Sequence, residues 1–290
     1  MRKNIALLAL LMLCCKNTYA AEVAEEARKI VDTYKDTVVS VQLVLQMSYG
    51  GASEKRETKL SCTATIVDPS GLVVTSLSSV NPADVFRGLS ADEDEEFKIT
   101  SRIVDAKIKC SDGTEIPADI VLRDRDLDLA FLRPKKPVDT PLPYVDLSKA
   151  GNPQLLDELV VLNRLGQVAS RTIAVSIDRI QAIVTKPRTF YVVGGTSTMG
   201  FGYPSFCLDG KPAGLLVLRI AQTRDDSEGL FSMFNRMLPV VLPASTVQKL
   251  VEQAKTAAPV KEEDNTKPAP KSGTKPNPKT PEKPPSKSGK

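Results

Sequence analysis

Short runs of apolar and β-branched residues recur along most of the chain, with turn residues such as Ser111-Asp112-Gly113 between them. Runs of this length and spacing, without helical patterns between them, predict an all-β protein. In the first half we expect strands over residues 37–45, 61–67, 71–77, 106–110, 115–122 and 128–132. In the second half we expect strands over residues 159–162, 171–177, 180–184, 190–193, 205–208 and 212–220.

Helical patterns flank these strands. Residues 22–35 carry apolar side chains at helical spacing, and residues 244–255 predict a short closing helix. A Pro-rich connector over residues 134–143 separates the two groups of strands. We therefore expect an N-terminal helix over residues 21–36, a first barrel or sandwich over 37–137, and a second over 138–258 that includes the closing helix.

The two ends differ from the body of the chain. Residues 1–20 combine a basic start, an apolar run over residues 5–15 and the small-x-small site Thr18-Tyr19-Ala20, which predicts a secretory signal peptide. The apolar run is well short of the ~20 residues that cross a bilayer, so we expect no transmembrane span. Residues 259–290 are rich in Pro, Lys, Ser and Thr without an aromatic residue, which predicts a disordered tail.

Charge and composition narrow the chemistry. The net charge of +4 is carried by the two ends, so the mildly acidic body gives no electrostatic footprint for nucleic acid. The chain has no histidine, which excludes an imidazole general base and histidine metal ligands. We expect neither a metal nor a cofactor. Cleavage after Ala20 would leave Cys62, Cys110 and Cys207, as one disulfide and one thiol or as three thiols.

Five segments, in order along the chain, resemble the trypsin-like HtrA/Deg serine proteases. The first is TIVDPSGLVVT at residues 65–75, which is similar to the family's hairpin before the catalytic histidine. The other four are residues 107–118, the Asp-Leu-Ala-x-Leu strand at 128–132, residues 208–214, and residues 242–247 at the entry to the last helix. The resemblance implies two six-stranded Greek-key β-barrels with a cleft between them.

The triad positions depart from the family pattern. Ser78 stands at the position of the histidine and Phe201 at that of the nucleophilic serine, so only Asp128 is kept. Phe201 has no nucleophilic oxygen, and Ser78 is no base near neutral pH. Met199 replaces a glycine of the family's oxyanion hole, where a β-carbon disfavours the required backbone conformation. Because the histidine is missing, we interpret Asp128 as a carboxylate that accepts backbone N–H hydrogen bonds at the junction of the barrels.

The degenerate triad predicts a non-catalytic peptide- or protein-binding pseudoprotease, exported by a bacterium to the periplasm or beyond. Its candidate cleft comprises Met199, Gly200, Phe201, Gly202 and Tyr203, and extended or unfolded segments are the expected ligands. Phe201 either lines this cleft or closes it as a core residue.

Two other functions stay open. One is an active serine-type endopeptidase or other hydrolase with an unrecognised nucleophile, for which Cys207 and a Ser–Lys pair are candidates. The other is a structural envelope protein whose basic tail contacts an anionic surface, although the same tail could serve only as a solvated spacer.

Overall fold

The protein is described here by a computed structural model that covers residues 20–49, 56–82, 99–194, 200–220 and 237–260. The predicted signal peptide, except for Ala20, and the predicted tail, except for Pro259 and Val260, lie outside the described residues. Candidate cleft residue Met199 also lies outside them.

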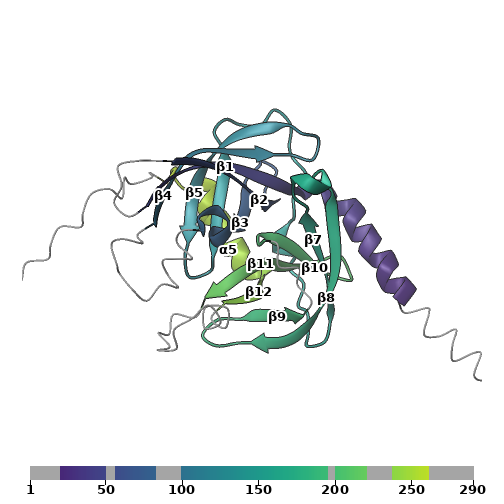
Figure 1. The fold of residues 1–290 in the computed structure, drawn as a ribbon. Helices are drawn as coiled ribbons and strands as arrows, with labels where there is room; N and C mark the ends of the chain where they lie inside the picture. Colours follow the sequence, from purple (N-terminus) through teal and green to yellow (C-terminus); the bar gives the residue numbers. More distant parts are fainter. Residues whose placement is uncertain (1–19, 50–55, 83–98, 195–199, 221–236, 261–290) are drawn as a thin grey trace, which may run out of the picture.

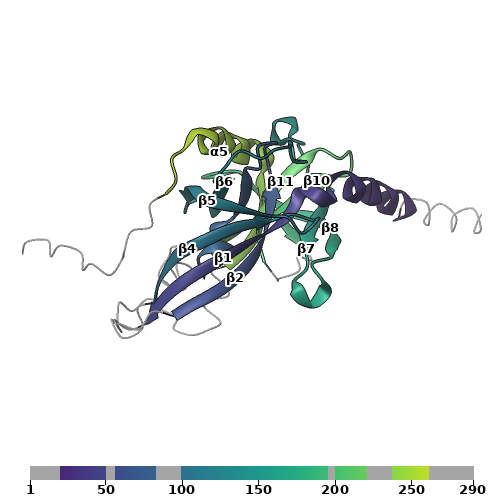
Figure 2. The same ribbon diagram turned by 90° about the horizontal axis from the view of Figure 1, so that it is seen from above.

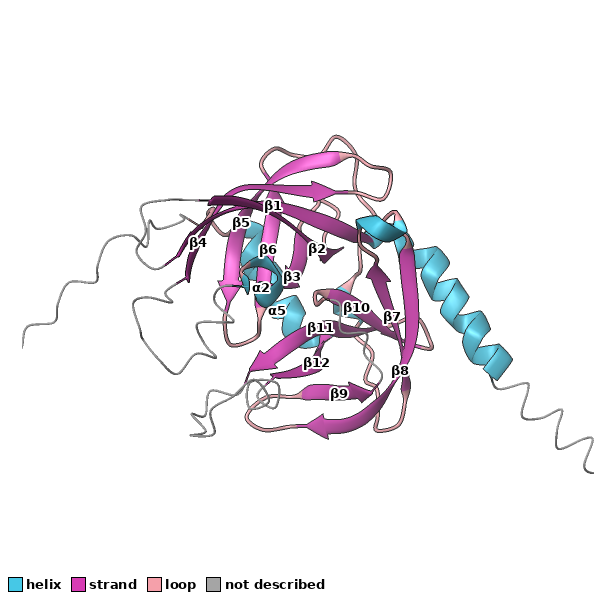
Figure 3. Cartoon of the chain, in the orientation of Figure 1, coloured by secondary structure: helices cyan, strands magenta, loops and turns pink. Residues whose placement is uncertain are grey.

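Twelve antiparallel strands form two closed six-stranded barrels (Figures 1 and 3). The first contains β1 (Val38–Tyr49), β2 (Arg56–Ile66), β3 (Val73–Ser76), β4 (Ile99–Lys109), β5 (Glu115–Asp124) and β6 (Leu129–Pro134), in the order β1-β2-β3-β6-β5-β4. The second contains β7 (Glu158–Arg164), β8 (Ile173–Val184), β9 (Phe190–Gly194), β10 (Tyr203–Cys207), β11 (Pro212–Ile220) and β12 (Met237–Pro243), in the order β10-β11-β12-β9-β8-β7. The predicted all-β class is confirmed, and the architecture is that of a trypsin-like double barrel.

Helices lie at both ends of the described chain and between strands. Residues 20–34 form the N-terminal helix, followed by η1 (Lys35–Thr37). The others are α2 (Leu77–Val80), η3 (Leu147–Lys149), η4 (Gln167–Ala169) and the closing helix α5 (Ala244–Thr256). In the part of the chain that the structure describes, no helix combines the length and the apolar character that a membrane crossing requires.

Three clusters of buried apolar side chains hold the molecule together. One fills the first barrel and includes Leu43 and Ile108, and another fills the second barrel and includes Leu159 and Ile180. The third joins the outer faces of the barrels to the N-terminal helix and to α5. In this third cluster the Tyr34 ring stacks on Phe206, with ring centroids 4.3 Å apart.

Two strands differ from the sequence-based expectation. The separate strands predicted over residues 171–177 and 180–184 are one continuous strand, β8, whose pairing with β9 shifts register between Ile180 and Ala182. Strand β12 was not predicted, although it pairs with β11 along its whole length.

Of the two arrangements that the sequence left open for the cysteines, the structure has three thiols, because Cys62, Cys110 and Cys207 are all free.

Arg133 joins the first barrel to the end of α5. Its guanidinium donates to the carbonyl oxygens of Ala254, Lys255 and Ala257, at 3.3, 2.7 and 2.9 Å. A helix C-terminus leaves its last carbonyls without intrahelical donors, and a cation there also interacts favourably with the helix dipole. Arg133 therefore caps α5 from the neighbouring strand β6.

We expect Arg133→Ala to lower the free energy of unfolding by about 1–3 kcal/mol, because three carbonyls lose a charged donor. Denaturant unfolding followed by circular dichroism measures the change. Arg179→Ala is the matched control, since the exposed Arg179 side chain forms a single ion pair among the described residues, with Glu158, and its loss should cost under about 1 kcal/mol. Equal costs for the two variants would contradict the capping role.

Candidate functional site

The carboxylate of Asp128 lies at the junction of the two barrels and accepts four hydrogen bonds. Oδ1 accepts from the backbone N–H of Ser78 at 2.7 Å and from its hydroxyl at 2.6 Å. Oδ2 accepts from the Ser76 hydroxyl at 2.5 Å and from the backbone N–H of Leu218 at 2.8 Å. Since Leu218 belongs to the second barrel and the serines to the first, the carboxylate ties the barrels together.

Burial dominates the electrostatics of this carboxylate. Asp128 is only 6% exposed, and the loss of hydration raises its pKa above the ordinary aspartate value, although the four donors oppose that rise. Asp128 also has a left-handed backbone, with φ of 56°, directly before β6. Aspartate is one of the few residues with a side chain that adopt this conformation at low cost, because its short polar side chain can form hydrogen bonds nearby.

The sequence places Ser78 beside Asp128 through a short local element. Strand β3 pairs with β6 through Ser76 and Leu129, and the chain then turns into α2 at Leu77. The backbone N–H of Leu77 donates to the Asp128 carbonyl at 2.9 Å, which fixes the start of α2 against the aspartate. Ser78 is therefore oriented by both its main chain and its hydroxyl.

Gly202, in the segment from Gly200 to Tyr203, packs against strands β2 and β3 of the first barrel. The Gly202 carbonyl accepts from the Thr65 hydroxyl at 3.1 Å, and the Gly202 N–H donates to the Leu216 carbonyl at 2.7 Å. A β-carbon on Gly202 would lie 3.0 Å from the backbone nitrogen of Ser76. The structure thus brings Gly202 of the candidate cleft next to Ser76, one of the two serines that bind Asp128.

Phe201 and Tyr203 take different positions. Tyr203 is buried in the second barrel, where burial raises the pKa of its phenol to about 12 although Asn163 is hydrogen-bonded to it. Phe201 is half-buried and packs against the apolar cluster inside the second barrel. No nucleophilic atom occupies position 201, and the residue as a whole keeps part of its surface accessible.

The thiols are poor nucleophiles in this structure. Burial raises the pKa of Cys62 to about 12, and burial together with nearby Asp209 and Asp157 raises the pKa of Cys207 to about 11. The thiolate is the reactive form of cysteine, so little of either residue is reactive near neutral pH.

A backbone feature that the sequence reasoning missed lies on β11. Residues 214–220 pair with β12 on one side, whereas β10 pairs with β11 only as far as Leu216. The Leu216 carbonyl and the Leu218 N–H both point away from β12, and strand alternation turns the N–H and carbonyl of Ile220 the same way. Within the described residues, no strand pairs with this edge beyond Leu216. The sequence signal for this unpaired stretch is a difference in length. The apolar run 212–220 is longer than its partner run 205–208, so part of it extends beyond the pairing.

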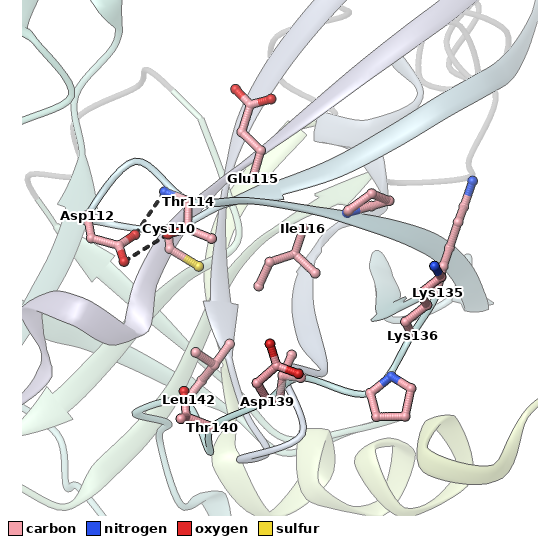
Figure 4. A pocket seen from close by; sticks show the side chains of 13 residues that line it. Cys110, Asp112, Thr114, Glu115, Ile116, Lys135, Lys136, Asp139, Thr140 and Leu142 are labelled. Atoms are coloured by element: carbon pink, nitrogen blue, oxygen red, sulfur yellow. Dashed lines mark hydrogen bonds between the residues drawn. The ribbon is translucent and has the colours of Figure 1, made fainter.

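A separate pocket of about 580 Å³ lies on the first barrel (Figure 4). It is bordered by the β4–β5 turn, where Asp112 accepts two hydrogen bonds from Thr114, and by the connector after β6. Its wall includes Ile116 and Leu142, which also pack on the core of the first barrel. None of its lining residues belongs to the Asp128 junction or to the candidate cleft.

Among the described residues, no group of three or more Cys, Asp or Glu side chains has a geometry that could hold a metal ion.

No protein-family model matches the chain, and no curated protein sequence matches it.

Proposed function

We propose that the protein is an exported, degenerate member of the trypsin-like HtrA/Deg class that binds extended peptide or protein segments without cutting them. The observation that carries this proposal is the Asp128 junction. The carboxylate at the acid position is held by Ser76, Ser78 and Leu218, while Phe201 stands at the nucleophile position and packs on the second barrel.

The chemistry around Ser78 argues against hydrolysis. Its hydroxyl donates to a carboxylate that three other donors also bind, and within the described residues no hydrogen bond joins it to an amine base that could take its proton. The raised pKa values of Cys62 and Cys207 argue equally against a thiol nucleophile. These features favour a binding module over the alternative of a hydrolase with an unrecognised nucleophile.

Within the described residues, no strand pairs with β11 beyond Leu216 on the side facing away from β12, and this open edge supports binding by strand addition. An extended segment would gain main-chain hydrogen bonds from the Leu218 carbonyl and from the N–H and carbonyl of Ile220. Such pairing needs backbone groups rather than a triad, so it survives the loss of the catalytic residues. Phe201 directly precedes Gly202, whose N–H donates to the Leu216 carbonyl on this side of β11, so its half-buried side chain would add an apolar surface for one side chain of the ligand.

The test combines binding and cleavage on one substrate. The chain from Ala21 to Lys290 is incubated for a day with labelled, unfolded casein, and fluorescence anisotropy and intact mass spectrometry are both recorded. We expect a rise in anisotropy and no new casein fragments. Fragments that disappear in Ser78→Ala or Cys207→Ala would show a hydrolase, and unchanged anisotropy would refute the binding function.

A matched pair of variants locates the site in the same assay. Phe201→Asp should weaken casein binding strongly while the circular dichroism spectrum is kept, because it puts a charge on the apolar surface. Tyr144→Asp, at an exposed aromatic residue on the connector of the first barrel, should leave binding unchanged. Loss of folded structure in Phe201→Asp would instead assign Phe201 to the core.

A further inference from the structure

The chain that leaves α5 continues along the first barrel. At the end of the helix Ala257 has an extended backbone, with φ of −63° and ψ of 142°. The Arg133 guanidinium donates to the Ala257 carbonyl at 2.9 Å, and the Lys255 ammonium lies 3.1 Å from the Asp68 carboxylate. Figure 2 shows α5 beside β5 and β6, with which it is in contact. These contacts direct residues 257–260, which we call the strap, toward β5.

Val260 pairs with β5 beyond the part of that strand that pairs with β4. Among the described residues, β4 and β5 pair only through residues 107–109 and 115–117. The Pro117 carbonyl accepts a hydrogen bond on the β6 side, so strand alternation turns the Ile120 carbonyl to the opposite side. There it accepts from the Val260 N–H at 2.7 Å. The strap therefore takes a main-chain acceptor on the edge of β5.

The sequence of the strap suits this position. Val260 is half-buried and packs on the apolar cluster inside the first barrel, whereas Ala258 and Pro259 are exposed. Pro259 fixes its own φ and biases Ala258 toward an extended backbone, so the strap is preorganised to pair as a strand. The missing N–H of Pro259 costs little, since successive N–H groups along a strand point to opposite sides. A main-chain bond and one inserted side chain are the contacts that a ligand makes in strand addition.

The hold of the strap on β5 is small. Within the described residues it consists of one backbone hydrogen bond and one half-buried side chain. Such a contact opens at a much lower free energy than global unfolding, and it binds weakly when it is not tethered. The covalent link to α5 compensates by raising the local concentration of the strap. The strap can therefore leave β5 while both barrels stay folded.

We propose that the edge of β5 at Ile120 is a strand-addition site and that the strap is its exchangeable internal ligand. The site takes extended segments in which a β-branched apolar residue follows a proline. The N–H of that residue pairs with the Ile120 carbonyl, and its side chain packs on the cluster inside the first barrel. The site involves neither the Asp128 junction nor the edge of β11, so this inference does not rest on the proposed function.

The first test asks whether Val260 holds the strap in place. NMR follows the Ile120 methyl group in the chain from Ala21 to Lys290 with ¹³C-labelled isoleucine methyls, and Ile120→Val identifies the signal. We expect Val260→Asp to shift this signal while the circular dichroism spectrum is kept. Val260→Pro, which has no N–H to donate, should shift it as well. Ala258→Asp, at an exposed position of the same strap, should leave it in place. An unchanged signal in both Val260 variants would overturn the inference.

The second test asks whether a segment added in trans can replace the strap. The peptide Thr-Ala-Ala-Pro-Val-Lys has the sequence of residues 256–261. In Val260→Asp it should return the Ile120 signal toward its position in the natural protein, with half-saturation at about 1–10 mM, because its contacts are few. The same peptide with Asp in place of Val should have no effect. Return of the signal with both peptides, or with neither at about 20 mM, would overturn the inference and leave the proposed function standing.

Discussion

An alanine at position 202 is expected to destabilise the protein by about 2–5 kcal/mol. Gly202 has a φ of +94°, which costs a residue with a side chain about 1–2 kcal/mol. Its new β-carbon would also overlap the Thr75 hydroxyl and lie 2.8 Å from the Thr63 carbonyl oxygen and 3.0 Å from the Ser76 nitrogen. The last two atoms are backbone, so relief would require strands of the first barrel to move, at a cost of about 1–3 kcal/mol more.

A substitution of Gly113, in the β4–β5 turn, separates the conformational cost of an alanine from the cost of its close contacts. Gly113 has a φ of +91°, close to that of Gly202, but nothing lies within 4 Å of the β-carbon that an alanine would add there. Gly113→Ala should therefore show the conformational cost alone. The chain lacks tryptophan, so urea unfolding is followed by far-ultraviolet circular dichroism. Equal losses in the two variants would mean that the close approach of the barrels at Gly202 contributes nothing.

The sequence predicted the hairpins well because their turns are encoded locally. Ser111-Asp112-Gly113 forms the β4–β5 turn, with Asp112 accepting from the Thr114 N–H and hydroxyl and Gly113 at positive φ. The segment 65–75 is likewise a hairpin, with Gly71 at a φ of +86°. Turn chemistry of this kind depends on a few neighbouring residues, so a single sequence is enough to place it.

The error at β8 has a specific physical cause. Asp178 pairs with Leu159 across β7 and shares its face, so the carboxylate points into the second barrel and is only 3% exposed. Burial raises its pKa, and the Ser176 hydroxyl opposes that shift. In the sequence, a charged residue between two apolar runs predicts the end of one strand and the start of another. In the structure, β8 continues through Asp178.

We attribute the missed strand β12 to its two prolines, Pro239 near the start and Pro243 at the end. Proline gives no N–H to a ladder and normally lowers the expectation of a strand. Pro239 is tolerated because it lies opposite Leu218, whose backbone groups point away from β12, so no hydrogen bond is lost between these two residues. Only the pairing register shows this.

The candidate site was foreseen in part. The resemblance placed Ser78 and Asp128 together, and they are in contact. The sequence gave no sign of Ser76 or Leu218 as partners, because the bonds to Asp128 span 52 and 90 residues of chain.

Replacing Asp128 with asparagine should cost about 2–4 kcal/mol, even though the two side chains have the same shape. One carboxylate oxygen receives the N–H of Ser78 and the other that of Leu218. An amide has only one oxygen, so in either orientation its NH₂ group faces a backbone N–H that cannot rotate away. Asn adopts left-handed backbone readily, so the φ of 56° adds little to the cost. Asp126→Asn, at the exposed ion pair with Arg188, is the control and should cost under about 1 kcal/mol.

The cost of Asp128→Asn should also depend on pH, with a definite sign. Because burial raises the pKa of Asp128 in the folded state, its protonation favours folding. That contribution is complete below about pH 3.9, the ordinary value for an unfolded aspartate, and is lost as pH rises through the higher folded pKa. Asparagine does not titrate, and the other carboxylates cancel in the difference between the two proteins. The difference in unfolding free energy between the natural protein and the variant should therefore be larger at about pH 3 than at about pH 7. A difference that grows toward neutral pH would instead mean that the four donors outweigh burial and hold the pKa of Asp128 below its ordinary value.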